Sequence, residues 1–280
     1  MEHLENKILV PVDFSEHSLA GLEQSYNLAR FSNAEIILLH VLTESNADDN
    51  SYFEEIKGKL GEFAKLVAEK SRLNISYRLE KGKLIETIIE VAEKIRAKMI
   101  VVGTTDPKGI MQKMMGANDL RLIREAKCPV VTLKDSKPRT KCKNIVVPLD
   151  LSKETGQKVA TAIHLAKYFG GRIFAVTAVA TGVEYDQDRL RTQLSQVKRY
   201  VNDHGIECET EYIKTQNNNS KIAKTLLEYA DSVDGDLMLI MTQQEVEFVE
   251  FFIGSLAKEI IHDAQIPIMS IIPKAKRVTN

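Results

Sequence analysis

The residue types best suited to chemistry in this chain are glycines and an aspartate that follow apolar runs. Asp13 comes directly after the run ILVPV at 8–12, and Gly103 and Gly116 bracket the later segment GTTDPKGIMQKMMG. A glycine lets the backbone approach a ligand closely, and a helix that begins after Gly116 would offer free N–H groups to an anion. These residues therefore favour the binding of a phosphate-bearing ligand.

A catalytic interpretation of the first turn is weaker. Asp13, Ser15 and His17 have the residue types of a hydrolase triad, but no G-x-S-x-G elbow accompanies them. Ser15 also suits a helix N-cap, and Asp13 and Asp150 suit local capping of a turn as well as they suit ligand contact. We expect no catalytic residue here, and both roles stay open for the two aspartates.

The other candidate side chains have simpler interpretations. His40 ends an apolar run, where a structural histidine is commoner than a metal ligand, and Lys108 and Lys113 could meet either phosphates or water. The three cysteines are widely spaced, with no CxxC motif and no nearby histidine pair, so we expect reduced thiols and no metal site.

Composition and charge restrict the partners. The chain has 38 Lys and Arg against 39 Asp and Glu, and it has no Trp. It therefore has neither a basic field nor many stacking surfaces for nucleic acid. Its net charge of -1 also gives no overall positive charge to hold it on an anionic membrane. Without a signal peptide or an apolar stretch of about 18 residues, we expect a cytoplasmic protein with no membrane or nucleic-acid partner.

Apolar runs alternate with amphipathic segments, which predicts an α/β fold. In the first half the runs at 8–12, 35–42 and 99–103 are mainly apolar, as is typical of parallel strands buried on both faces. Such strands need helical crossovers, so we predict a doubly wound sheet. The helices are expected at 16–31, 52–72 and 84–97, with Ser15 as an N-cap and Asp119 in the first turn of a last helix.

The chain contains one internal duplication. KILVPVDFS at 7–15 returns as NIVVPLDLS at 144–152, and the segment from Gly116 to CPVVTL matches the segment from Gly254 to IPIMSI. The offset is 137 residues at the first landmark and 138 at the second, so a whole domain is repeated. The second copy has strands expected at 145–149, 172–179, 206–213, 237–241 and 267–272, and helices at 153–169, 184–204, 220–233 and 255–264.

We therefore predict two tandem domains. The first spans 1–133 and the second 144–273, and a polar tail follows at 274–280. The segment KDSKPRTKCK at 134–143 has the polar, basic composition of an exposed linker.

The repeated VPVDFS opening, the glycine-containing loop after the fourth strand and the helix leading to CPVV resemble the universal stress protein family, here in tandem. The resemblance covers nearly the whole chain. It implies a five-stranded parallel sheet of order 3-2-1-4-5 in each domain, with helices on both faces. It also implies adenine-nucleotide binding, since nucleotide-binding members carry G-x-x-G, nine residues, and then glycine with Ser or Thr.

In the first copy the family's pattern is incomplete. Asp106 stands at the second glycine, and a carboxylate there repels phosphates unless a cation such as Mg²⁺ bridges the charges. Ala117 takes the hydroxyl position, where the next residue, Asn118, offers an amide instead. The resemblance implies a site for ATP or another adenine nucleotide made of Pro11, Val12, Asp13, Val41, Gly103, Thr104, Gly116, Ala117 and Asn118.

The second copy departs further from the pattern. Asp150, Gly254 and Ser255 remain as a second, weaker site. Met241 stands at the place of Gly103 and adds a side chain where close approach is needed, and the acidic stretch EVEFVEFF follows it. We expect a nucleotide in the first domain only.

Two functions stay open on the sequence. One is a stress-response protein that binds an adenine nucleotide in its first domain, and the other is a nucleotide-independent interaction protein or small-ligand-binding pseudo-dimer. An adenylating enzyme with a PP-loop would carry SGGxDS-like glycines where this chain reads VDFSEHS. We therefore expect at most slow ATP hydrolysis.

The last strands of the two copies predict a partner for each domain. PVVTL and PIMSI end the implied strand order at a sheet edge, and an unpaired apolar edge needs to be covered. We expect the two domains to pair through these strands as a fused dimer, and a homo-oligomer of the whole chain stays open.

Overall fold

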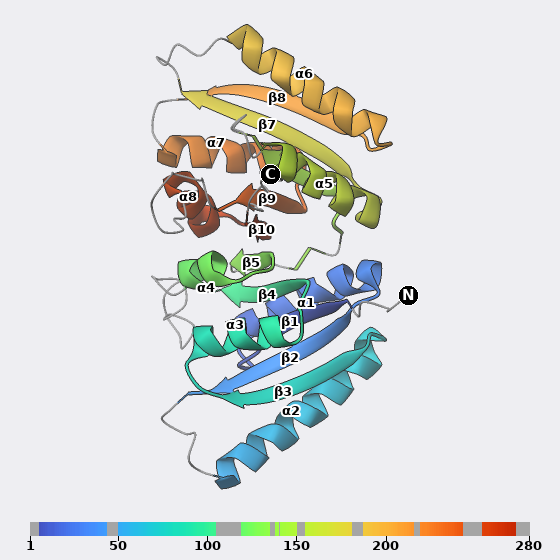
Figure 1. The fold of residues 1–280 in the computed structure, drawn as a ribbon, viewed down its shortest axis with the longest axis vertical. Coiled ribbons are helices and arrows are strands. Elements are labelled where there is room, and N and C mark those ends of the chain that lie inside the picture. Colours follow the sequence, from blue (N-terminus) through green and yellow to red (C-terminus); the bar gives the residue numbers. More distant parts are fainter. Residues whose placement is uncertain are drawn as a thin grey trace, which may run out of the picture. The chain divides into compact units, whose positions relative to one another are not determined.

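The computed structural model divides the chain into two compact units, Met1–Thr140 and Lys141–Asn280. It describes residues 6–43, 50–104, 119–134, 138–139, 141–149, 155–180, 187–215, 219–242 and 254–272. Each unit is an alternation of strands and helices (Figure 1).

The elements of the first unit are β1 (Lys7–Pro11), α1 (Glu16–Ser32), β2 (Glu35–Leu42), α2 (Asn50–Ser71), β3 (Ile75–Lys81), α3 (Leu84–Lys94), β4 (Met99–Thr104), α4 (Asp119–Glu125) and β5 (Val130–Lys134). Those of the second unit are β6 (Asn144–Pro148), α5 (Thr155–Phe169), β7 (Arg172–Ala180), α6 (Gln187–Asp203), β8 (Cys208–Thr215), α7 (Asn219–Ser232), β9 (Leu237–Met241), α8 (Ser255–Asp263) and β10 (Ile268–Ile271).

Both units have the same sheet topology. The first runs β3-β2-β1-β4-β5 and the second β8-β7-β6-β9-β10, and the pairs within each unit are parallel. In the first unit α3 and α4 cover one face and α1 the other (Figure 1). The predicted fold class and strand order, two tandem doubly wound α/β domains, are confirmed.

The central strands are buried as their apolar sequences predict. Ile8, Leu9 and Val10 of β1 are at most 1% exposed, and Ile145, Val146 and Val147 of β6 are fully buried. Strands covered on both faces have no polar side to alternate with the apolar one. This explains why unbroken apolar runs locate them in the sequence.

A proline ends the central strand of each sheet. Val12 N–H donates to the Leu39 carbonyl at 2.8 Å on the β2 side, so the nitrogen of Pro11 faces β4. Because proline has no N–H, the paired register between β1 and β4 stops at Leu9 with Ile100. β2 continues to Leu42 and β4 to Thr104, so both neighbours extend past β1.

Two predictions of local structure need correction. The helix expected at 84–97 ends at Lys94, because Arg96 turns left-handed at φ 54° and Ala97 N–H caps the Ala92 carbonyl at 2.8 Å. The segment 134–143 was expected to be exposed, but Cys142 is 1% exposed. The Arg139 N–H donates to Gln24 Oε1 at 2.8 Å, and the Arg139 carbonyl accepts from Asn27 Nδ2 at 3.0 Å, so α1 holds this part of the linker.

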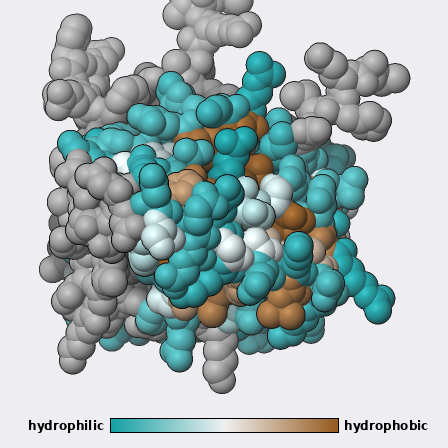
Figure 2. Space-filling model, turned by 90° about the horizontal axis from the view of Figure 1, so that it is seen from below, coloured by the Kyte–Doolittle hydropathy of each residue, from teal (hydrophilic) through white to brown (hydrophobic). Residues whose placement is uncertain are grey.

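The edge of the first sheet is formed by β3, beside α2. Apolar side chains on this face lie in separate patches among hydrophilic ones (Figure 2). Leu66 on α2 is 60% exposed and Tyr77 on β3 is 40% exposed, while Arg78 and Glu80 lie within 3.7 Å as an ion pair on the same strand. Charged side chains on an edge strand oppose pairing with another chain. Among the described residues, no helix has the length and apolar character to cross a membrane.

Candidate functional site

The turn after β1 holds Asp13 at the carboxyl end of the first sheet. Asp13 Oδ1 accepts from the Ser15 N–H at 3.0 Å and from Ser15 Oγ at 2.5 Å. Ser15 in turn accepts from the Ser18 N–H at 3.3 Å, which confirms it as the N-cap of α1. The local capping role of Asp13 therefore uses its Oδ1 atom.

The Asp13 carboxylate stays ionised in the fold. Partial burial raises its pKa, but hydrogen bonds from Ser15 and Ser18 outweigh burial, so the net pKa lies below the ordinary value of 3.8. A depressed pKa means that the ionised group contributes stability above pH 3.8, and that this contribution is lost as the pH falls through the lower folded value. At neutral pH the turn therefore presents a negatively charged carboxylate at the end of β1.

Phe14, next to Asp13, has an unusual backbone. Its φ of 64° lies in the left-handed region, which is a strained choice for a bulky residue. Its ring lies 5.5 Å from that of His40 and 5.6 Å, edge to face, from that of Phe63 on α2. The sequence does not point to Phe14, because no local residue pattern predicts a positive φ at a phenylalanine.

The strain at Phe14 can be measured by comparing two truncations. We expect Phe14→Gly to have a free energy of unfolding about 1 kcal/mol higher than Phe14→Ala, because both lose the ring and only glycine relaxes at positive φ. Urea unfolding of the two variants tests this. As a control, exposed Glu62 in α2 should give the reverse order, with Gly about 1 kcal/mol less stable than Ala. The same order at both positions would contradict the strain.

His40 is held by the backbone of the same turn. Its Nδ1 lies 2.7 Å from the Val12 carbonyl, and a carbonyl only accepts, so Nδ1 carries the proton. This bond gives His40 a structural partner, as the structural interpretation expects. Within the described residues, no group of three His, Cys, Asp or Glu side chains could hold a metal.

Val41 lies where β2 runs past the end of β1. The Leu39 carbonyl accepts from Val12 on the β1 side, and the Leu42 carbonyl accepts from Gly82 N–H at 3.0 Å on the β3 side. Because successive peptide groups of a strand point to opposite sides, the N–H and C=O of Val41 point to the β1 side. There β1 has already ended, so these groups face the space above Asp13.

Gly103 is required by the packing of α1 on β4. A Cβ on Gly103 would lie 1.8 Å from the His17 carbonyl oxygen, and a Cβ on Gly21 would lie 2.6 Å from the Gly103 nitrogen. Thr104 also has a structural partner, since its buried Oγ1 donates to the Leu133 carbonyl at 3.2 Å. The structure thus gives both residues a packing role, and any role in ligand contact stays a prediction.

Several predicted site residues lie outside the described residues. They are Asp106, Lys108, Lys113, Gly116, Ala117, Asn118 and Asp150. The structure therefore brings together Pro11, Val12, Asp13 and Val41 at one end of the first sheet, with Gly103 on the neighbouring strand β4.

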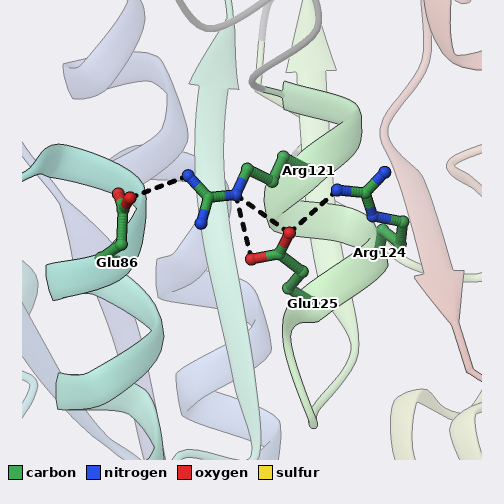
Figure 3. A network of polar contacts seen from close by, with 4 residues as sticks. All are labelled: Glu86, Arg121, Arg124 and Glu125. Atoms are coloured by element: carbon green, nitrogen blue, oxygen red, sulfur yellow. Dashed lines mark hydrogen bonds and ion pairs between the residues drawn. The ribbon is translucent and has the colours of Figure 1, made fainter. Parts of the chain in front are cut away.

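The helix that follows the undescribed loop is fixed by an ion-pair network. Arg121 of α4 donates from Nη1 to Glu86 of α3 at 2.9 Å and from Nε to Glu125 at 2.9 Å, and Arg124 donates to Glu125 at 2.9 Å (Figure 3). These bonds hold the pKa values of Glu86 and Glu125 below their ordinary range. The network ties α4, whose first turn contains Asp119 as predicted, to α3.

The second domain replaces both close-packed glycines with larger residues. Met241 stands in β9 at the position of Gly103, and Lys158 stands in α5 at the position of Gly21. Lys158 is 6% exposed, and its Nζ donates to the Pro148 carbonyl at 3.0 Å. Since the Leu149 N–H of the same peptide donates toward β7, this carbonyl points toward β9. A buried ammonium therefore lies at the end of β6, where the first domain has none.

The remaining residues of the second site are less constrained. Gly254 precedes α8 with φ −57°, and a Cβ there would meet nothing within 4 Å, so packing does not require a glycine. Ser255 is exposed in the first turn of α8. Sequence analysis noted Met241 but missed Lys158, although the repeat offset of 137 residues pairs it directly with Gly21.

The three cysteines are free, and their burial, partial for Cys128, disfavours the reactive thiolate. It raises the pKa of Cys128 to about 11, of Cys142 to about 12 and of Cys208 to about 11. At pH 8 we expect iodoacetamide to alkylate each thiol on the order of 100-fold more slowly in the native protein than in urea, as followed by mass spectrometry. Native alkylation of any one thiol at the rate of free cysteine would contradict these pKa values.

The matches to known proteins divide the chain into the same two domains. The sequence profile of the universal stress protein family matches residues 5–134 and again residues 141–271. The chain belongs to the universal stress protein family. It is a tandem form with two copies of the family's domain, as the resemblance predicted.

Individual relatives agree with this assignment. The universal stress protein MJ0531 of Methanocaldococcus jannaschii is 31% identical over 146 residues, covering 49% of this chain and 86% of the relative. YxiE of Bacillus subtilis is 25% identical over 146 residues, covering 46% of this chain and 99% of the relative. A crystal structure of a universal stress protein from Archaeoglobus fulgidus shares the fold with a TM-score of 0.75 at 18% identity, covering 96% of this chain and 99% of that chain.

Proposed function

We propose that this tandem universal stress protein binds one adenine nucleotide, in its first domain, at the carboxyl end of β1. The observation that carries the proposal is the pair of Val41 peptide groups facing the space beyond the last residue of β1. A nucleobase edge with an adjacent donor and acceptor, as adenine has at its amino group and ring nitrogen, matches a peptide N–H and C=O on one strand edge.

Asp13 supplies the second contact. The Ser15 bonds hold its carboxylate at the end of β1, and its lowered pKa keeps it charged at neutral pH. A carboxylate at the end of a parallel strand suits the hydroxyls of a ribose, as in other doubly wound nucleotide-binding folds. The base at Val41 and the ribose at Asp13 then lie on neighbouring strands.

The phosphates are assigned to the segment between β4 and α4. Gly116, Ala117 and Asn118 lie there, outside the described residues, and we keep them as proposed phosphate contacts together with Lys108 and Lys113. Mg²⁺ enters the proposal as the partner of the phosphates, where it would offset the charge of Asp106.

The proposal leaves the second domain without nucleotide. Lys158 and Met241 replace the two glycines on which α1 and β4 meet, and the Lys158 ammonium already bonds the end of β6. The larger side chains at both positions change the shape of this end of the sheet. Asp150, Gly254 and Ser255 remain in the sequence, but the two glycines of the first domain do not.

Mass spectrometry of the small molecules released from the natively purified protein tests the function. We expect an adenine nucleotide in an amount no greater than one per chain. A protein that releases no nucleotide, and that takes up none when dialysed against ATP with Mg²⁺, would favour the nucleotide-independent alternative. Release of a different small molecule would redirect the assignment to that ligand.

A further inference from the structure

Phe14 combines three properties that packing alone does not explain. Its backbone is held at a φ of 64°, the residue is 36% exposed, and its ring contacts two other aromatic rings from separate elements. Strained residues persist where the surrounding structure holds them, and they concentrate at functional sites. A ring kept partly open to solvent by a strained backbone is suited to meet something outside the chain.

The two neighbouring rings determine where the Phe14 ring lies. His40 extends from β2 and is fixed by its Nδ1 bond to the Val12 carbonyl at 2.7 Å. Phe63 extends from α2 and meets Phe14 edge to face, at an interplanar angle of 75°. The Phe14 ring is therefore held at the carboxyl end of β1 and β2, on the side of the sheet that α2 covers.

The peptide groups of Val41 lie beside this ring but in another plane. Side chains of successive strand residues point to opposite faces, so His40 faces the α2 side and Val41 the other, while the Val41 N–H and C=O lie in the sheet. A planar ring bonded to them would continue the sheet over the end of β1. One of its faces would then turn toward the α2 side, where the Phe14 ring lies.

We infer that the Phe14 ring is the stacking surface for the base of the nucleotide in the first domain. The inference rests on the proposed function and adds to it the residue that stacks on the face of the base. The Val41 peptide groups bind the edge of the base, Asp13 binds the ribose hydroxyls, and the Phe14 ring covers one face of the base. His40 and Phe63 are positioning residues behind the Phe14 ring. Stacking strength grows with ring area, so purine nucleotides bind more tightly than pyrimidine nucleotides.

The chain is suited to an optical test, because it contains no Trp. Phe14→Trp keeps an aromatic surface and makes it the single tryptophan fluorophore. A base stacked on this indole quenches its emission, so we expect saturable quenching by ATP with Mg²⁺ and none by ribose 5-phosphate. Phe31→Trp is the matched control, since Phe31 is 46% exposed at the opposite end of α1 and should give no quenching.

A second variant separates stacking from structure. Phe14→Leu keeps an apolar side chain against Phe63 but removes the flat surface, and we expect its ATP affinity by calorimetry to fall roughly 5- to 100-fold. The affinity of Phe14→Trp should stay within a few-fold of wild type. Far-UV circular dichroism and the urea midpoint show whether each variant is folded.

The outcomes distinguish the inference from the function on which it rests. Calorimetric binding of ATP to wild type, without quenching in Phe14→Trp and without an affinity loss in Phe14→Leu, would overturn the role of Phe14 and leave the nucleotide site standing. Equal quenching in Phe31→Trp would also overturn it. No binding of ATP to wild type would overturn the proposed function and the inference together.

Discussion

Replacing Gly103 with alanine is expected to lower the free energy of unfolding of the first domain by about 3 kcal/mol. The added Cβ would lie 1.8 Å from the His17 carbonyl oxygen and 3.1 Å from the Gly21 nitrogen, and both are backbone atoms of α1. A helix backbone cannot swing aside as a flexible side chain can, so α1 must move as a unit away from β4. Urea unfolding, with hydrogen exchange of the β1 and β4 peptides to report on the first domain, measures the effect.

Gly58 provides the matched control. It lies within α2 in the same domain, and a Cβ there would meet nothing within 4 Å. Gly58→Ala should therefore raise the free energy of unfolding by about 0.5–1 kcal/mol, because alanine is the better helix former. If Gly103→Ala were as stable as Gly58→Ala, the close contact between α1 and β4 would be wrong.

This result also decides how the nucleotide site can be tested. From the sequence alone, a Gly103→Met variant is the natural way to test whether the backbone at Gly103 passes close to a bound phosphate. In the structure any side chain at that position displaces α1, so loss of binding in Gly103→Met would report on packing as much as on the ligand. Asp13 is the better probe.

The second large effect is expected for Asp13→Asn, which should weaken ATP binding roughly 10- to 100-fold. Asparagine keeps the size of the side chain and one oxygen for the Ser15 N–H, but it loses the charged acceptor that we assign to the ribose hydroxyls. Isothermal titration with ATP and Mg²⁺ measures the loss. Because the pKa of Asp13 is lowered, affinity should not change with pH between 5 and 8 through this group.

Asp150→Asn is the control for Asp13→Asn, since the repeat places Asp150 at the same position of the second domain. We expect its affinity for ATP to match that of wild type. Loss of binding in Asp150→Asn with none in Asp13→Asn would place the nucleotide in the other domain.

Regular features of the sequence predict most of the fold, and the reason is physical. Strands buried on both faces leave continuous apolar runs such as ILVPV, and a duplicated domain repeats them at a constant offset, so element order and strand order follow. Ser15 as a helix N-cap follows from local hydrogen bonding in the same way. The predicted bounds are wrong where no residue type indicates a turn. The helix expected at 84–97 ends earlier because Arg96, which is not a glycine, has a left-handed backbone.

The candidate site is predictable only in part. Asp13 and Val41 follow from the ends of strands, but the direction of the Val41 peptide groups depends on how far β1 pairs with β2. The positive φ of Phe14 and the contact between Gly21 and Gly103 depend on packing between elements far apart in sequence. Lys158 could have been found, because the repeat aligns it with Gly21, but its bond to Pro148 could not.

The stoichiometry of ATP binding to the intact chain tests the central claim most directly. Titration of the full-length protein with ATP and Mg²⁺, from which retained nucleotide has been removed, should give one site per chain. That site should be weakened by Asp13→Asn and unchanged by Asp150→Asn. Two equivalent sites per chain, or a single site that is insensitive to Asp13→Asn, would contradict the assignment of the nucleotide to the first domain alone.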